Sequence, residues 1–445
     1  MEARAQQHRA VIISTGDELL TGQLQDSNAR WLSEKLVGLG ILPVEHVAVG
    51  DAIEDLVGTI RRAAERAPVV IMSGGLGPTD GDLTREAICR ASGDSPVLDA
   101  AVRANLEAML RTRGRQMTAR QERQAFRPSR ATPLANEFGT APGLMVRMGV
   151  GAPWRETLVF CLPGPPGELR PMFEREVPAR VAVGDRVVLT RLLHVVGLPE
   201  ADCVDRLGEL TRRDRTPLVG ITASGGILTI RIRHEVGVEL RDVASGLVDE
   251  TERAIRAALG DHVLPLDPEQ RSGSESLAAS VIDRLTARAL TLSTVESCTG
   301  GMLGEQLTSI SGSSAAYLGG HITYANALKE ALGVDADALR RHGAVSSEVA
   351  GQMAAAGLRE TGASLSVAIT GIAGPGGGTP AKPVGTVHIA IASVDKVVDQ
   401  RQFLFAGDRE DIRRRACAAA LTMVHFHLCG RRPGEPRLLW ESRTA

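Results

Sequence analysis

Both halves of the chain repeat one unit that strongly limits the fold: a short apolar strand, a glycine turn and a helix. Residues 11–15 (VIIST) and 69–73 (VVIMS) are such strands in the first half, and residues 289–297 (ALTLSTVES) are one in the second. A strand with no polar alternation is buried on both faces, and strands that alternate with helices pair in parallel. The pattern therefore predicts an α/β fold with two three-layer domains and mostly parallel sheets.

The middle of the chain differs from both halves. Residues 186–268 follow a strand, helix, strand, helix pattern without a cluster of chemical groups, which predicts a small α+β module. A stretch rich in Pro, Ser and Gly at 265–276 marks its end. A chain of 445 residues also needs more than one core. We expect domains at residues 1–185, 186–268 and 269–430, and a flexible Pro- and Arg-rich tail at 431–445.

Charge and composition limit the partners of this chain. Lys and Arg number 51 against 53 Asp and Glu, so bulk charge gives no reason to expect binding to nucleic acid or to a membrane surface. No stretch reaches the roughly 18–20 apolar residues of a membrane span, and no apolar run follows the N-terminal charges. The six cysteines form no CxxC pair. We expect a cytoplasmic protein that acts on small molecules.

The segment VESCTGGMLG (295–304) places small polar residues between a strand and a helix. Free backbone amides and the positive end of the helix dipole there suit a nucleophile and an oxyanion. Ser297 is one candidate nucleophile, and Cys298 is another because a helix N-terminus lowers the pKa of a thiol. The alternative is that Ser297 or Thr299 only caps the helix.

Lys329 lies in a helix that is otherwise rich in Ala and Leu (HITYANALKEALG, 321–333). A lysine in a dry pocket has a depressed pKa and can accept a proton from a serine hydroxyl. The alternative is a solvated surface lysine.

A long Gly/Pro loop occupies much of residues 368–387 (AITGIAGPGGGTPAKPVGTV). Its glycines let backbone amides approach a phosphate or a carbonyl closely. A flexible hairpin connection is the alternative, although the prolines at 375, 380 and 383 stiffen the loop.

The first half has its own cluster in TGDELLTG (15–22) and SGGLGPTDGDLTREA (73–87), each of which follows a strand. Glycines at the start of a helix can cradle a phosphate. Carboxylates at 17, 18, 80 and 82 can hold a divalent cation beside it. The alternative is a glycine turn followed by acidic helix caps.

Five segments of the last third match one known family in order and spacing: ESCTGG, TYANALKEALGV, HGAVSSEVA, TGIAGPGGGTPAKPVGTV and GDREDIRRRA. Over residues 275–428 the chain resembles the nicotinamide mononucleotide deamidase domain. The resemblance implies that Ser297 attacks the carboxamide of that nucleotide and that Lys329 takes the serine proton. It implies release of ammonia without a metal or other cofactor.

The resemblance also implies a set of substrate-binding residues around that pair. Arg409 would meet the nucleotide phosphate, for which the geometry of a guanidinium is suited. The whole implied set is Thr299, Gly300, Tyr324, Asn326, Thr370, Gly371, Ala373, Gly374 and Arg409.

Residues 10–180 resemble the molybdopterin-binding fold, in the version found at the front of the CinA (competence/damage-inducible protein A) family. NEFGTAPG (136–143) and LPGPPGEL (162–169) extend the likeness, and the middle module resembles the KH-like module of that family. Some members split ADP-ribose at its diphosphate with a divalent metal such as Mg²⁺. The resemblance implies a homodimer, a nucleotide or phosphate site, and metal ligands at Glu18 and Asp82. The implied phosphate-site residues are Gly74, Gly75, Gly77, Thr79, Thr84 and Asn136.

The chain departs from that family at one position. The family pattern is GPTxDDxT, whereas this chain has GPTDGDLT, with Gly81 in place of the first aspartate. Asp80 stands one position early. The departure puts the metal site and the pyrophosphatase activity of the first domain in question.

Two other classes of function remain open. One is a non-catalytic factor associated with competence or DNA damage, for which salt-sensitive DNA binding would be diagnostic. The other is a pterin-binding protein, since a shared fold does not imply a shared function. The KH resemblance does not imply RNA binding, because the module has no GXXG clamp with flanking basic residues.

Overall fold

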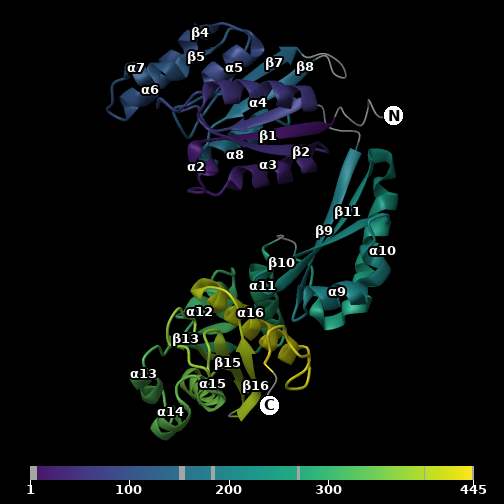
Figure 1. Cartoon of the computed structure of the whole chain (residues 1–445), viewed down its shortest axis with the longest axis vertical. Coiled ribbons are helices and arrows are strands. Elements are labelled where there is room, and N and C mark those ends of the chain that lie inside the picture. Colours follow the sequence, from purple (N-terminus) through teal and green to yellow (C-terminus); the bar gives the residue numbers. More distant parts are fainter. Residues whose placement is uncertain (1–7, 150–155, 182–185, 268–270, 395, 443–445) are drawn as a thin grey trace. The chain divides into compact units, whose positions relative to one another are not determined.

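The computed structural model describes residues 8–149, 156–181, 186–267, 271–394 and 396–442 (Figure 1). The chain divides into two compact units. The first comprises Met1–Val188 with Glu235–Asp242, and the second comprises Leu189–His234 with Val243–Ala445. No helix of the described residues is long and apolar enough to cross a membrane.

The first unit is built on a six-stranded sheet of order β2-β1-β3-β8-β7-β6. The first four of these strands are parallel, and β7 and β6 run antiparallel to their neighbours. The strands are β1 (Arg9–Thr15), β2 (Leu42–Val49), β3 (Val69–Ser73), β6 (Thr132–Leu134), β7 (Gly143–Gly149) and β8 (Glu156–Leu162).

Helices cover both faces of this sheet. Alternate residues of β1 point to opposite faces, so Ile12 packs with α3 and α8, whereas Ile13 packs with α4 and α5. These helices are α3 (Ser27–Gly38), α4 (Ile53–Arg66), α5 (Thr84–Ser92) and α8 (Pro166–Glu176). The smaller elements are α2 (Asp17–Leu20), β4 (Pro96–Leu98), α6 (Ala100–Thr112), α7 (Ala119–Glu122), η1 (Arg123–Ala125) and β5 (Phe126–Pro128).

The module between the two larger domains has a three-stranded sheet of order β10-β11-β9, in which β10 and β11 are antiparallel. Leu193, Ile230 and Ile255 belong to its own buried cluster. The elements are β9 (Arg186–Val196), α9 (Glu200–Leu207), β10 (Leu218–Ser224), β11 (Ile227–Gly237) and α10 (Arg241–Leu259).

The C-terminal domain has a five-stranded sheet of order β13-β12-β14-β15-β16. The strands are β12 (Leu292–Glu296), β13 (Tyr317–Ile322), β14 (Leu365–Gly371), β15 (Thr386–Ser393) and β16 (Lys396–Leu404). Helices α11 (Gly273–Thr286), α12 (Met302–Thr308) and α16 (Arg409–Leu428) pack on one face, and α15 (Ser347–Thr361) packs on the other. Two short helices, α13 (Asn326–Ala331) and α14 (Ala336–His342), lie between β13 and α15 in the chain.

The predicted α/β class is confirmed, with helices on both faces of two large sheets and a small antiparallel sheet between them in the sequence. Both large sheets are mixed. In the C-terminal sheet β12 pairs in parallel with β13 and β14, but β15 and β16 are antiparallel. The connection at 372–385 contains no helix that would carry the chain back to the start of the sheet, so β15 must reverse direction.

The segment after Gly430 contacts the edge of the C-terminal sheet through residues 436–442, whereas residues 431–435 are exposed. Leu438 is 5% exposed, and the carbonyl of Trp440 accepts a bond of 3.0 Å from the amide of Leu404. The buried Arg401 donates to Glu441 at 3.2 Å. This segment follows the outer edge of β16, whose unpaired backbone groups it partly satisfies. Residues 443–445 lie outside the described part of the chain.

Candidate functional sites

Ser297 lies directly after β12, where the chain leaves the sheet. Its amide donates to Ile369 of the neighbouring strand β14 at 2.9 Å, so the parallel ladder holds its backbone. Gly300 and Gly301 follow with φ of +61° and +95°, a conformation that favours glycine. A Cβ at Gly301 would also come within 2.9 Å of the Ile322 side chain. The two glycines therefore let the chain turn sharply into α12.

Lys329 meets Ser297 inside the domain. Its Nζ lies 3.1 Å from Oγ of Ser297, 2.6 Å from the carbonyl of Thr323 and 3.2 Å from that of Tyr324. The lysine is 1% exposed and the serine 8% exposed. Burial lowers the pKa of Lys329 below its ordinary value. The alternative of a solvated surface lysine is therefore wrong.

The surroundings of Lys329 satisfy both of its protonation states. As an ammonium ion it can donate one N–H to each of the three oxygens around it. As a neutral amine it can keep two N–H bonds to the carbonyls and turn its lone pair to the Ser297 hydroxyl. Proton transfer between the two residues thus leaves no buried donor without an acceptor.

The helix start after Ser297 is not the open array of amides that the sequence predicts. The carboxylate of Glu296 accepts from the amides of Gly301 at 3.0 Å, Leu303 at 3.1 Å and Gly304 at 2.8 Å. Those donors are occupied because the last residue of β12 folds its side chain over the first turn of α12. Among the described residues, the amides of Cys298 and Thr299 donate to no other residue, so they are the donors left for an oxyanion.

Cys298 does not fit the alternative role of nucleophile. It is 5% exposed, and burial, with a further contribution from nearby Glu296, raises the pKa of its thiol to about 12. The expectation that the helix dipole would lower this pKa is wrong, because Glu296 occupies the helix amides with negative charge. The thiolate that a cysteine nucleophile requires is disfavoured.

Three of the predicted substrate-binding residues lie together. Arg409, the first residue of α16, donates from Nη1 to the carbonyl of Gly374 at 2.8 Å and from Nη2 to the hydroxyl of Tyr324 at 3.3 Å. The Tyr324 side chain is 62% exposed. Arg409 thus ties the Gly/Pro loop to the segment before Lys329. Asn326 is exposed on the first turn of α13.

Two other predicted residues, Thr370 and Gly371, fix the backbone near the site. The Thr370 hydroxyl, 1% exposed, donates to the carbonyl of Ala344 at 2.7 Å, which fixes the loop before α15. A Cβ at Gly371 would lie 2.9 Å from the carbonyl of Thr386, so glycine permits close pairing with β15 there. Ala373 is buried and Gly300 is exposed.

Two hydroxyls beside the Ser–Lys pair have no partner in the described structure. Thr299 is fully buried and Thr323 is 3% exposed, yet neither Oγ1 makes a hydrogen bond. Arg413 also contacts this turn, since its Nη2 donates to the carbonyl of Thr299 at 2.8 Å. Thr323 and Arg413 were not predicted as site residues, although they lie within the matched segments TYANALKEALGV and GDREDIRRRA, next to Tyr324 and one helical turn from Arg409.

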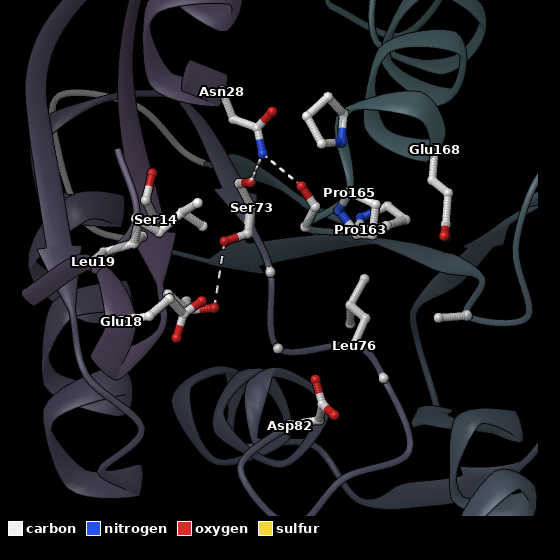
Figure 2. Close-up of a pocket in the computed structure, with 18 of the residues that line it drawn as sticks. Ser14, Glu18, Leu19, Asn28, Ser73, Leu76, Asp82, Pro163, Pro165 and Glu168 are labelled. Carbon is white, nitrogen blue, oxygen red and sulfur yellow. Dashed lines mark hydrogen bonds between the residues drawn. The ribbon is translucent and has the colours of Figure 1, made fainter. Parts of the chain in front are cut away.

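The first unit has a pocket of about 590 Å³ at the carboxyl ends of its parallel strands, where open α/β sheets bind ligands (Figure 2). Five predicted residues line it: Glu18, Gly74, Gly75, Gly77 and Asp82. Lining residues that were not predicted include Ser14, Asn28, Ser73, Gln124, Pro163, Pro165 and Glu168. Ser14 and Ser73 lie at strand ends, and Pro163, Pro165 and Glu168 belong to the LPGPPGEL segment, so these two patterns could have indicated them as pocket residues.

Asn28 links two loops of this pocket. Its Nδ2 donates to Oγ of Ser73 at 3.0 Å and to the carbonyl of Gly164 at 2.7 Å, as Figure 2 shows. Beneath the loop, the Thr84 hydroxyl donates to the carbonyl of Gly74 at 2.9 Å. A Cβ at Gly75 would fall 2.3 Å from that hydroxyl oxygen, so only glycine fits there without a shift.

Three predicted phosphate-site residues act on the loops and do not line the pocket. Thr84 supports the glycine loop from below. Asn136 donates to Glu168 at 2.7 Å and thereby positions a lining residue. Thr79 donates its amide to Asp82 at 2.8 Å.

The acidic residues of this unit do not form a ready metal site. Asp80 points to Arg120 at 3.3 Å and Arg123 at 2.9 Å, which lower its pKa, so it does not replace the missing carboxylate at position 81. Across the described ranges, no three His, Cys, Asp or Glu side chains converge on an arrangement that could hold a metal ion. Glu18 and Asp82 therefore fit a resident metal poorly, and no chemical step is derived through one.

Family models match three consecutive parts of the chain. They are the probable molybdopterin binding domain over residues 11–182, the damage-inducible protein CinA KH domain over 190–264 and the CinA C-terminal domain over 274–428. Together they follow the order of elements described above.

Whole proteins of this arrangement match along nearly their full length. A CinA-like protein from Gemmatimonas aurantiaca is 38% identical over 439 residues, which cover 97% of this chain and 99% of the relative. A CinA-like protein from Frankia casuarinae is 39% identical over 442 residues, which cover 95% and 96%. A crystal structure of a competence/damage inducible protein from Agrobacterium tumefaciens is 42% identical over 35% of this chain and 95% of its own, with a TM-score of 0.34. The chain therefore belongs to the CinA family.

Proposed function

We propose that the C-terminal domain hydrolyses the carboxamide of nicotinamide mononucleotide to nicotinate mononucleotide and ammonia. The observation that carries this proposal is the 3.1 Å contact between Nζ of Lys329 and Oγ of Ser297 in a buried setting. A buried amine with a lowered pKa beside a hydroxyl is a known way to activate serine without histidine.

The reaction would proceed in two halves. Neutral Lys329 takes the hydroxyl proton while Oγ of Ser297 attacks the carboxamide carbon, and the amides of Cys298 and Thr299 stabilise the oxyanion. The lysine then gives the proton to the leaving nitrogen, which departs as ammonia and leaves an ester on Ser297. Water attacks the ester, Lys329 takes one of its protons and returns it to the departing Ser297 oxygen, and the carboxylic acid product releases its own proton to solvent as the carboxylate.

Arg409 supports a mononucleotide as the substrate. Two of its five N–H groups are engaged by Gly374 and Tyr324, and the other three donate to no described residue and can bind an anion such as the nucleotide phosphate. The exposed ring of Tyr324 offers a flat surface beside it. A phosphate and an aromatic amide are the two ends of the proposed substrate.

The test is ammonia release from nicotinamide mononucleotide by the purified full-length protein. Ser297→Ala and Lys329→Met should each abolish most of the activity, whereas Ser309→Ala and Lys396→Met, at exposed positions, should retain it. Full activity in either of the first two variants would refute the mechanism. No ammonia release by the wild type would refute the substrate.

A second activity is proposed for the first unit, because its pocket of about 590 Å³ joins a glycine loop to the polar ends of parallel strands. We propose that it takes a nucleotide diphosphate of the ADP-ribose type. AMP release from ADP-ribose, measured with and without Mg²⁺, tests this. Binding of a pterin without any hydrolysis would instead favour a binding role.

A further inference from the structure

Glu296 is a buried carboxylate next to the proposed nucleophile, and the proposed reaction does not use it. It is 1% exposed, and among the described residues no cation lies within ion-pair distance of it. Its charge is compensated by three backbone amides at the start of α12, those of Gly301, Leu303 and Gly304. A buried charge is costly unless it is hydrogen-bonded, so this arrangement is specific to an ionised or strongly accepting side chain.

The three hydrogen bonds to Glu296 close a ring of backbone that includes Ser297. The ring begins at the end of β12, includes Ser297 and the two left-handed glycines, and returns to Glu296 through α12. Inside it, the Gly300 amide donates to the carbonyl of Ser297 at 3.2 Å. On the other side, Arg413 holds the carbonyl of Thr299. The Glu296 carboxylate therefore connects the helix end of this ring to its strand end.

The same contact decides which amides remain available. By occupying the donors of α12, Glu296 leaves those of Cys298 and Thr299 as the amides beside the serine hydroxyl. Its negative charge also lies near the Cys298 thiol and opposes ionisation of that group. Both effects favour the serine hydroxyl over the neighbouring thiol.

We propose that Glu296 is a positioning residue of the C-terminal site, which holds the Ser297 hydroxyl and the two remaining amides in line with the substrate carboxamide. The proposal rests on the proposed amidase function. Glu296 touches no substrate and acts through the turn that it fixes. Displacement of a reacting group by about 1 Å can cost roughly 100-fold in rate.

The principal experiment compares Glu296→Gln with Glu305→Gln in the full-length protein. Glutamine has nearly the same shape but one acceptor oxygen, so its NH₂ group would face an amide that also donates. We expect kcat to fall at least about tenfold in Glu296→Gln, with KM within about twofold. Glu305 is exposed on the same helix, and its variant should match the wild type. A Glu296→Gln protein that melts like the wild type and keeps the full kcat would overturn the proposal.

A second measurement separates this proposal from the identity of the substrate. Phenylmethanesulfonyl fluoride reacts with activated serines, and mass spectrometry of the Ser297 peptide gives the rate without any substrate. We expect slower labelling in Glu296→Gln than in Glu305→Gln even if nicotinamide mononucleotide proves to be the wrong substrate. Equal labelling rates, or no labelling of Ser297 in the wild type, would overturn the positioning role. Glu296→Asp, which keeps the charge, should recover part of the rate.

Discussion

The two candidate sites occupy equivalent places, at the carboxyl ends of parallel strands, but they differ in how complete they are. In the C-terminal domain, Ser297 and Lys329 are buried, in contact, and surrounded by acceptors that satisfy both protonation states. In the first unit, a pocket exists, but Asp80 faces two arginines and Asp82 is bound by Thr79. An assembled pair of reacting groups supports a mechanism, whereas a pocket alone supports only a ligand.

The largest effect that would sharpen this contrast is expected for Lys329→Met. It removes the base while filling the same space, so kcat/KM should fall at least about 10³-fold. The variant removes the desolvation cost of the buried amine but takes a donor from the carbonyls of Thr323 and Tyr324, so the two effects offset and the melting temperature should change little. Ammonia release and the melting temperature together measure this. A Lys329→Met protein that keeps both its melting temperature and its activity would contradict the role of the lysine as base.

The pH profile is the next test of the contrast. The pKa of Lys329 is lowered by burial, and its base form is the active one, so kcat/KM should rise about tenfold per pH unit until that pKa is passed. The contribution of Lys329 to the free energy of unfolding changes with pH in the same direction as the rate. The unfolded state binds more protons between the lowered pKa and about 10.5, so this lysine's contribution to stability falls as pH falls through that window. A wild-type profile without this rise, or the same rise in the residual activity of Lys329→Met, would contradict the assignment.

A smaller effect is expected for Arg409→Lys. Lysine keeps the positive charge but cannot bond Gly374, Tyr324 and a phosphate in one plane. We expect KM for nicotinamide mononucleotide to rise roughly tenfold with kcat within about twofold. Arg414→Lys, at an exposed position on the same helix, is the control. A fall in kcat with unchanged KM would place Arg409 in the chemical step instead.

The smallest effect, and the one that could break the contrast, concerns the first unit. A side chain at position 81 would begin 3.2 Å from the carboxylate of Asp51, whose pKa is already raised by burial and by Asp17. The new carboxylate of Gly81→Asp would therefore need a bound cation to offset its repulsion by Asp51. We expect AMP release from ADP-ribose to rise a few-fold with Mg²⁺ and not at all without it. An unchanged rate in Mg²⁺ would place the deficiency elsewhere in the pocket.

Much of this could be predicted from the sequence because it depends on local patterns. The buried strands β1 and β3 are largely apolar runs followed by glycine, and β14 is a largely apolar run that ends in glycine, a pattern that predicts a strand and a turn. The choice of Ser297 and Lys329 came from the family motifs, since 32 residues separate them and spacing alone left Cys298 and Thr299 open.

What the sequence did not predict depends on contacts between distant or competing groups. Glu296 was not singled out, because a glutamate at a strand end does not reveal that its carboxylate turns back onto the next helix. The direction of Asp80 depends on arginines 40 and 43 residues away. The contacts of residues 436–442 involve a buried arginine in β16, which composition alone does not reveal.

The contacts of residues 436–442 with β16 make this segment part of the edge of the last sheet. Arg401 is 4% exposed and shares its donors among Asp399, Glu441 and the carbonyl of Pro436. A protein shortened at Gly430 would lose two of those acceptors and free the Leu404 amide and the Gln402 carbonyl at the edge of β16. Such an edge recruits strands from neighbouring molecules, so the shortened domain should self-associate. Loss of activity in that protein would then report aggregation, although every residue of the Ser–Lys site is still present.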